Sequence, residues 1–284
     1  MTTVAILGTG KMGGAMARRL AASGFDVRLW NRTRDRAEQL QIGRVAATPA
    51  EAARGADVVI SSLTNEEAVR EVYLGDDGVL WSAAGMLLMD TSTAGPQVAE
   101  ELGRDAQAKG ARFLEAPVIG SVLAVESGKL LILAGGDQAD VEQARPILEH
   151  LGEVHYVGGR GDAQRMKLIA NSMLGITSAG AAELLAAGVA MGLDRSGVFS
   201  ILVRYTPGLA FRERGFVHEQ HTPPMFTVRD LVKDLDLGLR TYSEVGVSTP
   251  LTRETRELYA ETMRDLADLD ISAIVNTVNA RQPG

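Results

Sequence analysis

The sequence of 284 residues contains no cysteine. A chain without cysteine has no disulfide, no catalytic thiolate and no cysteine-ligated zinc site. Basic residues are also in the minority, because 29 lysines and arginines stand against 36 aspartates and glutamates, for a formal net charge of −7. No dense cluster of lysine and arginine occurs, so the sequence argues against nucleic acid and against an anionic membrane surface as partners.

No basic segment precedes the first apolar run, which lies within MTTVAILGTG (residues 1–10). That run is too short for a signal peptide or a membrane span. We therefore expect a cytoplasmic protein without a membrane partner. Hydrophobic residues make up 45% of the chain, which is ample material for a core.

The first half of the chain alternates between short β-rich runs and helical patterns, which predicts βαβ units and a parallel sheet. The expected strands are 4–8, 26–30, 57–63, 86–92, 111–118, 129–136 and 153–158. Beyond Gly161 no convincing strand follows, and residues 162–192 have the pattern of one long helix. We predict an α/β domain over 1–161, then an all-α domain over 162–284, joined by this interdomain helix. The tail 281–284 is expected to be loose.

Residues 4–14 read VAILGTGKMGG, a strand that runs into a glycine loop and then into a helix. Gly8 permits a tight turn, Gly10 lets the backbone approach a pyrophosphate, and Gly13 allows close packing of helix on strand. The start of the helix adds free N–H groups and the positive end of a dipole. The context predicts a Rossmann-type dinucleotide site that includes Thr9, Lys11 and Met12; the alternative is a glycine-rich turn without a ligand.

The end of the second strand indicates which dinucleotide is bound. A cofactor without a 2′-phosphate usually meets a carboxylate there, about 20 residues after the glycine loop. This strand instead ends in Asn31-Arg32-Thr33. Arg32 can hold a 2′-phosphate, with Asn31 and Thr33 adding hydrogen bonds. We therefore predict that NADP(H) is preferred over NAD(H); alternatively, Arg32 is a solvated surface arginine.

The strand over 86–92 ends in DTSTAGP (90–96), at the edge of the sheet where the glycine loop is expected. The hydroxyls of Ser92 and Thr93 can hold a substrate carboxylate or the nicotinamide amide. The alternative is that one of them caps the helix that starts at Pro96, and both roles are compatible.

Together these motifs resemble the β-hydroxyacid dehydrogenases, a family that includes 3-hydroxyisobutyrate dehydrogenases and glyoxylate/succinic semialdehyde reductases. The resemblance spans the whole chain. It rests on ILGTGKMGGAMARRL, DTSTAGP, LEAPVIGSVLAVESGKLLILAGGD, GRGDAQRMKLIAN and VKDLDLGL, in that order. WNRT and DLDISAIV look most like the semialdehyde reductase branch. The resemblance also implies a small-molecule substrate and a homodimer or homotetramer.

The resemblance implies that Lys167 is the catalytic residue. Hydride transfer to a carbonyl leaves a developing alkoxide, which needs a proton and a positive charge beside it. A lysine in a dry cleft has a lowered pKa and can exchange that proton near neutral pH. Asn171 lies at i+4 on the same helix face and can orient the lysine or the substrate. The alternative is an ordinary lysine that reaches solvent from the first turns of a helix.

The resemblance also implies cofactor contacts at Leu63, Thr64, Thr93 and Lys233, although Lys233 could equally be a solvated helix charge. Asp230, Asp234 and Asp236 are interpreted as surface charges, and the four histidines lack a convincing ligand spacing. We predict no metal site.

One departure from the family concerns the substrate loop, which usually reads P-V-S-G-[GS]. Here the loop is Pro117-Val118-Ile119-Gly120-Ser121. Isoleucine cannot bond a carboxylate or a carbonyl, so Ile119 makes the pocket more apolar. Ser121 can compensate only from a different direction.

Three functions remain open at the level of sequence. The leading one is an NADPH-dependent reductase, or the reverse dehydrogenase, of a small aldehyde, semialdehyde or hydroxyacid. An imine reductase would use the same architecture, but such relatives generally lack the lysine. A non-catalytic NADPH-binding protein is the third, and family members of that kind typically lost the lysine too.

Overall fold

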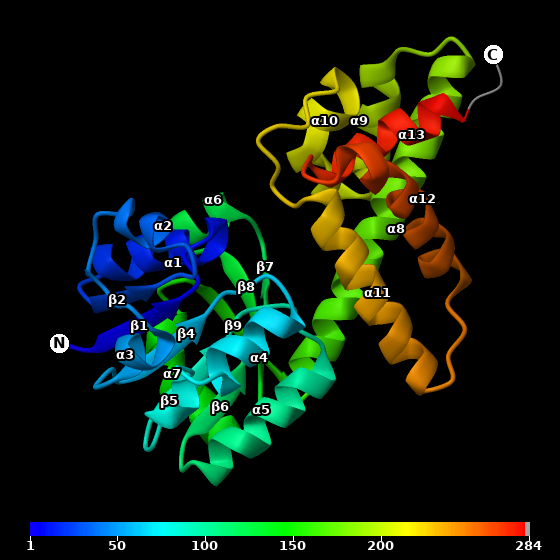
Figure 1. Cartoon of the computed structure of the whole chain (residues 1–284). Helices are drawn as coiled ribbons and strands as arrows, with labels where there is room; N and C mark the ends of the chain where they lie inside the picture. Colours follow the sequence, from blue (N-terminus) through cyan, green and yellow to red (C-terminus); the bar gives the residue numbers. More distant parts are fainter. Residues whose placement is uncertain (282–284) are drawn as a thin grey trace. The chain divides into compact units, whose positions relative to one another are not determined.

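The computed structural model describes residues 1–281 of the chain (Figure 1). It divides into two compact units, Met1–Lys167 and the part that begins at Leu168. The first holds a sheet covered by helices, and the second is helical, apart from one isolated bridge between Thr227 and Asp270. Helix α8 (Asp162–Ala190) starts in the first unit and continues into the second. The predicted fold class is confirmed.

The first unit is built on a nine-stranded sheet in the order β3-β2-β1-β4-β5-β6-β8-β7, with β9 paired to β8. The strands are β1 (Thr3–Leu7), β2 (Asp26–Trp30), β3 (Arg44–Val45), β4 (Val58–Ser61), β5 (Leu87–Asp90), β6 (Arg112–Glu115), β7 (Val118–Ile119), β8 (Leu130–Gly135) and β9 (Gly152–Gly158). Strands β1 to β6 pair in parallel, whereas β8 is antiparallel to both β6 and β7.

Two details of the sheet differ from the prediction. The short strand β3 was not predicted, and the expected strand 111–118 is split into β6 and β7. Pro117 lies between the two pieces and has no backbone N–H to donate to a ladder, so the chain turns there. The result is an antiparallel section that the alternation of the sequence did not predict.

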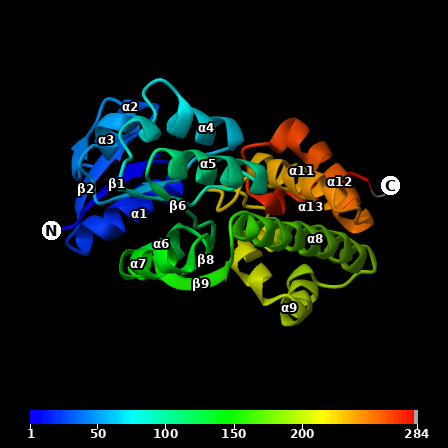
Figure 2. The same cartoon turned by 90° about the horizontal axis from the view of Figure 1, so that it is seen from below.

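Helices cover both faces of the sheet because successive residues of each strand point to opposite sides. In β1, Val4 and Ile6 pack into one buried cluster, and Ala5 and Leu7 into another. The first cluster includes residues of α1 and α7, and the second includes residues of α3, α4 and α5. Figure 2 shows α4 and α5 on one side of the sheet and α6 and α7 on the other. The helices are α1 (Lys11–Ala22), α2 (Arg34–Glu38), α3 (Pro49–Ala53), α4 (Glu66–Leu74), α5 (Pro96–Ala108), α6 (Val122–Glu126) and α7 (Gln138–Leu148), with a 3-10 turn η1 (Val79–Trp81).

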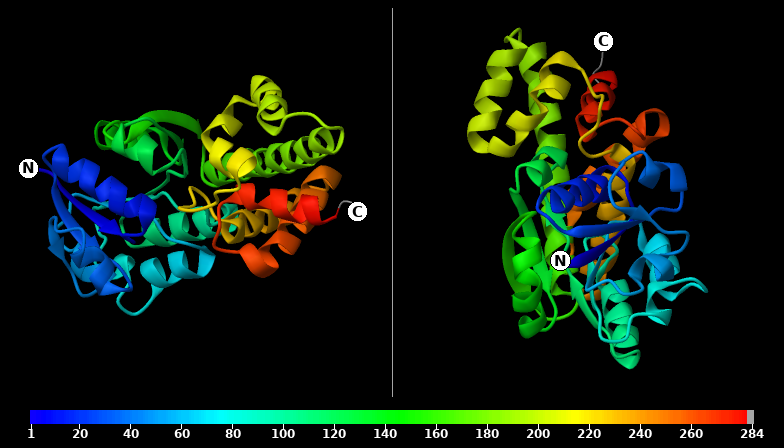
Figure 3. Two further views of the ribbon diagram at one scale, coloured as in Figure 1. Left: turned by 90° about the horizontal axis from the view of Figure 1, so that it is seen from above. Right: turned by 90° about the vertical axis from the view of Figure 1, so that its left-hand side faces the viewer.

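The second unit packs its helices around its part of α8 (Figure 3). They are α9 (Arg195–Tyr205), α10 (Glu213–His218), α11 (Val228–Glu244), α12 (Pro250–Leu266) and α13 (Ile274–Ala280), with 3-10 turns η2 (Pro207–Arg212) and η3 (Ile271–Ala273). Gly175 of α8 lets α11 and α12 approach closely, because an added Cβ would lie 3.3 Å from Thr255 Cγ2 and 3.5 Å from Leu235 Cδ2. Helix α8 has the length and apolarity of a membrane span, but its most apolar window is 44% buried within the protein.

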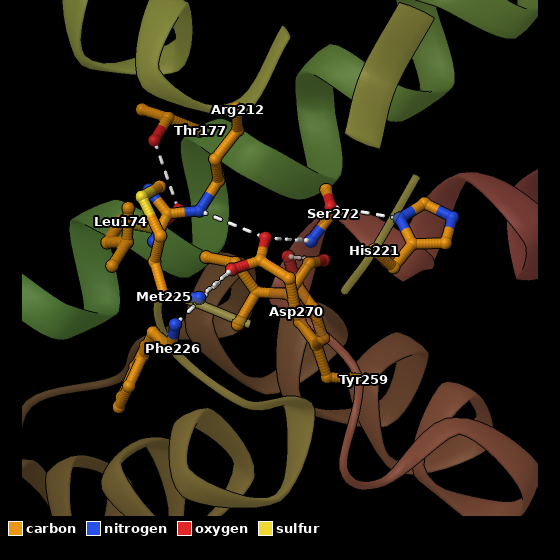
Figure 4. A network of polar contacts seen from close by, with 10 residues as sticks. Leu174, Thr177, Arg212, His221, Met225, Phe226, Tyr259, Asp270 and Ser272 are labelled. Atoms are coloured by element: carbon orange, nitrogen blue, oxygen red, sulfur yellow. Dashed lines mark hydrogen bonds and ion pairs between the residues drawn. The ribbon is translucent and has the colours of Figure 1, made fainter. Parts of the chain in front are cut away.

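A buried ion pair ties the end of η2 to the turn η3 in the second unit (Figure 4). Arg212 Nε lies 3.3 Å from Asp270 Oδ1, and the two side chains are 10% and 7% exposed. Asp270 also accepts hydrogen bonds from the backbone N–H groups of Met225, Phe226 and Ser272. The carboxylate therefore holds together segments that are separated by 45 residues in sequence.

At the C-terminus, Arg281 follows α13 and forms an ion pair with Glu261. The remaining residues of the tail expected to be loose, 282–284, lie outside the described part of the chain.

Candidate active site

The glycine loop between β1 and α1 has the close approaches that its sequence predicts. Gly8 has φ +92°, and a Cβ there would lie 2.3 Å from the carbonyl oxygen of Ser62. A Cβ on Gly13 would lie 1.9 Å from the carbonyl oxygen of Gly8. Both positions therefore require glycine.

Gly10 is different, because a Cβ there would meet no atom within 4 Å. It is the exposed N-cap residue of α1, and no side chain caps the helix at this point. Open space beside uncapped N–H groups at a helix start is the environment that an anion such as a pyrophosphate requires. The buried Thr9 adds a hydroxyl oxygen without a hydrogen-bond partner among the described residues. The loop thus fits a dinucleotide, with Lys11 exposed and Met12 partly buried beside it.

The amide of Asn31 braces this loop from the end of β2. Its Oδ1 accepts the N–H of Thr9 at 2.9 Å, and its Nδ2 donates to the carbonyl of Thr33 at 2.8 Å. These bonds use the oxygen and one N–H of the amide, and the second N–H of Nδ2 can still donate, so the contact of Asn31 with a phosphate stays a prediction. The side chains of Arg32 and Thr33 are exposed at the same strand end.

The predicted cofactor residues of the first unit lie at neighbouring strand ends, whereas Lys233 belongs to the second unit. The strand order reverses between β1 and β4, and ligands of such sheets bind in the crevice at this reversal. The N–H of Ser62 donates to the carbonyl of Leu7 at 2.8 Å, which joins the loop after β4 to the strand before the glycine loop. Leu63, which is partly buried, and Thr64, which is exposed, follow directly.

Ser92 lies in the next loop, after β5, and is 3% exposed. Its hydroxyl donates to Asp90 Oδ1 at 2.6 Å and accepts the N–H of Leu63 at 2.8 Å. Helix α5 begins at Pro96 after Gly95, and no side chain caps it. The N-cap residue is therefore Gly95 and not Ser92 or Thr93, and Pro96 at the first helical position has no N–H that would need a partner.

Asp90 is a buried carboxylate that the sequence did not single out. It is 2% exposed, and its Oδ1 accepts hydrogen bonds from the hydroxyls of Ser61 and Ser92. The phenol of Tyr73 lies 2.8 Å from Ser61 Oγ, and burial together with the charge of Asp90 raises the pKa of Tyr73 well above its usual value. The sequence did contain a signal for this buried carboxylate, because Asp90 is the one charged residue at the end of the apolar strand β5.

Two further polar residues, Glu115 at the end of β6 and Gln164 in the first turn of α8, are each 1% exposed. The Glu115 carboxylate, at the end of β6, accepts the backbone N–H groups of Gly161 and Gln164. Burial raises the pKa of Glu115 to about 7, although the two backbone donors act in the opposite direction. Glu115 therefore satisfies N–H groups that the start of a helix leaves without partners. Both residues lie within motifs of the resemblance, but no role was predicted for either of them.

The Gln164 side chain connects α8 to the loop after β5. Its Nε2 donates to the carbonyl of Ser92 at 2.9 Å, and its Oε1 accepts the N–H groups of Ala94 at 3.2 Å and Gly95 at 3.1 Å. Lys167 follows Gln164 by three residues on the same helix and is partly buried.

Asn171 belongs to the second unit and is 5% exposed. Its Nδ2 donates to Asp234 Oδ2 at 2.5 Å, and the other oxygen of Asp234 lies 2.6 Å from Lys233 Nζ. The Lys233 side chain is only 26% exposed and Asp234 only 2%. The interpretation of Asp234 as a surface charge is therefore wrong, and Lys233 is paired with a buried carboxylate rather than simply solvated.

The substrate loop follows β6. Ile119 is partly buried in β7, where it pairs with Leu131 of β8. Gly120 has φ +141°, and a Cβ there would lie 2.7 Å from Leu130 Cδ2, so the loop keeps its glycine for steric reasons. Ser121 is the N-cap residue of α6 but makes no side-chain cap bond.

No group of three or more histidine, aspartate or glutamate residues that could hold a metal occurs within residues 1–281. His218 and His221 are three residues apart in sequence, and only His221 is buried. The Nδ1 atom of His221 lies 3.0 Å from Ser272 Oγ, and burial lowers the pKa of His221 (Figure 4).

Both parts of the chain match families of known proteins. Residues 3–159 match the NAD-binding domain of 6-phosphogluconate dehydrogenase, and residues 161–278 match the NAD-binding region of NADP-dependent 3-hydroxyisobutyrate dehydrogenase. The chain is 36% identical to 3-hydroxyisobutyrate dehydrogenase of Pseudomonas aeruginosa, over 96% of this chain and 97% of that protein. It is 32% identical to glyoxylate/succinic semialdehyde reductase 1 of Arabidopsis thaliana, over 97% and 98%.

Among solved structures, 3-hydroxyisobutyrate dehydrogenase of Mycobacterium tuberculosis with L-serine is similar, with a TM-score of 0.88 and 29% identity over 99% of this chain and all of that one. An imine reductase of Myxococcus stipitatus with NAD+ has a TM-score of 0.66 at 18% identity, over 98% of this chain and 99% of that one, a likeness of fold alone.

Proposed function

Since the chain belongs to the β-hydroxyacid dehydrogenase family, and is thus an NAD(P)-dependent oxidoreductase acting on CH–OH groups, we propose that it is an NADPH-dependent reductase of small carbonyl compounds. The same enzyme would oxidise the corresponding alcohols. The observation that supports the proposal most is the position of Lys167 on α8. It lies one turn beyond Gln164, whose side chain donates a hydrogen bond to Ser92 in the loop after β5.

Lys167 is the proposed general acid and base. The bound nicotinamide cofactor supplies or accepts the hydride. In the direction of reduction, the ammonium of Lys167 donates a proton from Nζ to the substrate oxygen as negative charge develops there. In the direction of oxidation, the neutral amine takes the proton from the hydroxyl. Asn171 would orient the substrate or the lysine, since Asp234 holds its amide in one orientation.

The glycine loop would hold the pyrophosphate, and Arg32 would select the cofactor that carries a 2′-phosphate. In support, one part of the chain matches a region named for an NADP-dependent enzyme. The solved structure of Psf3, which is similar with a TM-score of 0.85 and 27% identity, contains NADP+.

Arg32→Ala is expected to weaken NADPH binding roughly 10- to 100-fold and to leave NADH binding unchanged, because hydrogen bonds to a charged group are worth about 1.5–3 kcal/mol. Titration of each cofactor against protein fluorescence measures both constants. Arg34→Ala is the control, because Arg34 is exposed and pairs with Glu38 at 2.7 Å. Equal losses for the two cofactors would contradict a role of Arg32 at the 2′-phosphate.

Steady-state turnover tests the proposed function as a whole. NADPH and NADH consumption are measured with semialdehydes, keto acids, uncharged aldehydes and cyclic imines, and NADP+ reduction with hydroxyacids. We expect turnover of at least one carbonyl substrate with NADPH and none of the imines. Turnover of imines alone would support the imine reductase, and tight NADPH binding without any turnover would support the non-catalytic protein.

The side chain of Ile119 leads us to expect different kcat/KM values for polar and apolar carbonyl compounds. Isoleucine offers no hydrogen bond to a substrate carboxylate, so less polar aldehydes should compete well with carboxylated ones. Ile119→Ser is included in the same measurement and should raise kcat/KM for carboxylated substrates about tenfold, the worth of one hydrogen bond to a charged group. No change in the ratio of polar to apolar substrates would show that Ile119 does not face the substrate.

The proposed assembly is a homodimer formed through α8. In the second unit Ile169, Met173 and Leu184 are 55%, 61% and 55% exposed on one face of this helix, and Gly180 between them has open space beside it. The hydroxyl of Thr177 on the same face donates to the carbonyl of Met173, so it does not need solvent. No charged residue occurs from Leu168 to Ala182. An exposed apolar stretch of this length fits a second copy of the same surface, as in isologous dimers.

Met173→Glu is expected to shift the protein from dimer to monomer, because two charges would be buried at a two-fold contact. Sedimentation equilibrium gives the mass of each form. Val245→Glu serves as a control, since Val245 is 73% exposed but lies after α11. A wild-type chain that sediments as a monomer at all concentrations would rule the dimer out.

A further inference from the structure

Gln164 differs from the residues already assigned, because it is fully buried and bonds only to backbone groups. A buried amide has two donors and two acceptor positions, and leaving them without partners is costly. Here one donor and the acceptor oxygen are used on three groups of one loop, Ser92 to Gly95. Packing alone would be served better by an apolar side chain of the same size.

The loop that Gln164 holds is itself joined to the cofactor side of the unit. Ser92 accepts the N–H of Leu63, which follows β4 at the reversal of strand order. A continuous path of hydrogen bonds therefore leads from the loop after β4, through Ser92, to Gln164 in the first turn of α8. All of these groups lie within the first unit.

The same turn is held from the other side by Glu115, whose carboxylate accepts the backbone N–H of Gln164 at 3.0 Å and that of Gly161. The first turn of α8 is thus fixed to two strand ends, those of β5 and β6. Lys167 lies one turn further along. Because a helix is stiff over one turn, a shift of its first turn moves the lysine by a similar amount.

We infer that Gln164 is a positioning residue, which sets the distance between Lys167 and the loop 92–95. The inference rests on the proposed role of Lys167. A misplacement of about 1 Å at a reacting group can cost roughly 100-fold in rate, so three hydrogen bonds that fix this distance have a direct kinetic consequence. The side chain of Gln164 bonds Ser92, Ala94 and Gly95 and not the glycine loop, so we expect the pyrophosphate contacts of that loop to be retained.

The test is a double-mutant cycle on kcat with Gln164→Met and Lys167→Ala. Methionine keeps the volume and loses every hydrogen bond of the amide. In the wild-type background, Gln164→Met should lower kcat roughly 30-fold, with the dissociation constant of NADPH unchanged. In the Lys167→Ala background, the same substitution should change kcat less than about twofold, because residues that act as a unit are non-additive.

Two results would overturn the inference: an unchanged kcat in Gln164→Met, or the same fold loss in both backgrounds, which marks a structural role. NADPH binding with a stoichiometry of one per chain shows that each variant is folded. Gln107→Met is the matched control, because Gln107 is exposed and bonds Arg160 on the surface. The single variant Lys167→Ala reports on the proposed function by itself, so a failure of that function is seen separately from a failure of the cycle.

Discussion

Replacing Lys167 with alanine is expected to lower kcat roughly 1,000-fold, while the dissociation constant of NADPH stays within about twofold of the wild-type value. The physical reason is that the developing alkoxide loses both its proton donor and the adjacent positive charge. The measurement is single-turnover oxidation of NADPH by the best substrate, followed by absorbance, with cofactor binding determined separately. Proton transfer by a placed side chain contributes about 100- to 10,000-fold, so the loss should lie in that range.

Lys167→Arg separates the two contributions of the lysine. Arginine keeps the positive charge but does not release a proton at neutral pH, so this variant should recover binding of a carbonyl substrate without recovering turnover. Lys109→Ala controls for loss of a lysine as such, because Lys109 stacks over Trp81 at 4.9 Å from the ring centroid, away from the strand ends of the site. Wild-type turnover in Lys167→Ala would exclude the mechanism.

Asp270→Ala is expected to lower the free energy of unfolding by about 3–5 kcal/mol. Its removal leaves the Arg212 guanidinium buried without its counter-charge, and it leaves three backbone N–H groups without an acceptor. A buried ion pair adds little net stability, because both charges lose their hydration. Removing one partner is nevertheless strongly destabilising, because the other charge stays buried without a counter-charge. Urea unfolding followed by circular dichroism measures the change.

Asp268→Ala provides the control for Asp270. Asp268 also pairs with an arginine, Arg229, but the two side chains are 85% and 61% exposed, so little stability should be lost. The double variant Arg212→Met with Asp270→Asn should be clearly more stable than the sum of the two single changes predicts, since no charge is then left buried. Strict additivity would show that the two side chains do not depend on each other.

The order of elements and the dinucleotide loop could be predicted because both are local. Alternation of strand and helix, and glycines at 8, 10 and 13, act over a few residues, so the sequence carries the whole signal. The positions of Lys167 and Asn171 on one helix face follow from helix periodicity in the same way. The resemblance of motifs then assigned roles to these positions.

The partners of these residues could not be predicted, because they come from distant segments. Asp234 lies 63 residues from Asn171, and Gln164 lies 72 residues from Ser92, so only folding places their side chains together. The same is true of Asp270, which looks like one more charge in a helical, polar stretch. Nothing in the local pattern separates it from Asp268, two residues away.

By itself, then, the sequence determined the fold class and the glycine loop, since both depend on the period and type of neighbouring residues. The catalytic role of Lys167 is a prediction that came from the resemblance of motifs. The tertiary structure alone decided which polar groups are buried and how they are paired: the Ser92 hydroxyl with Asp90 and Leu63, Glu115 with the start of α8, and Asp270 with Arg212. The physical reason is desolvation. A polar group removed from water must find a partner, and that partner is set by the packing of distant segments rather than by neighbours in sequence.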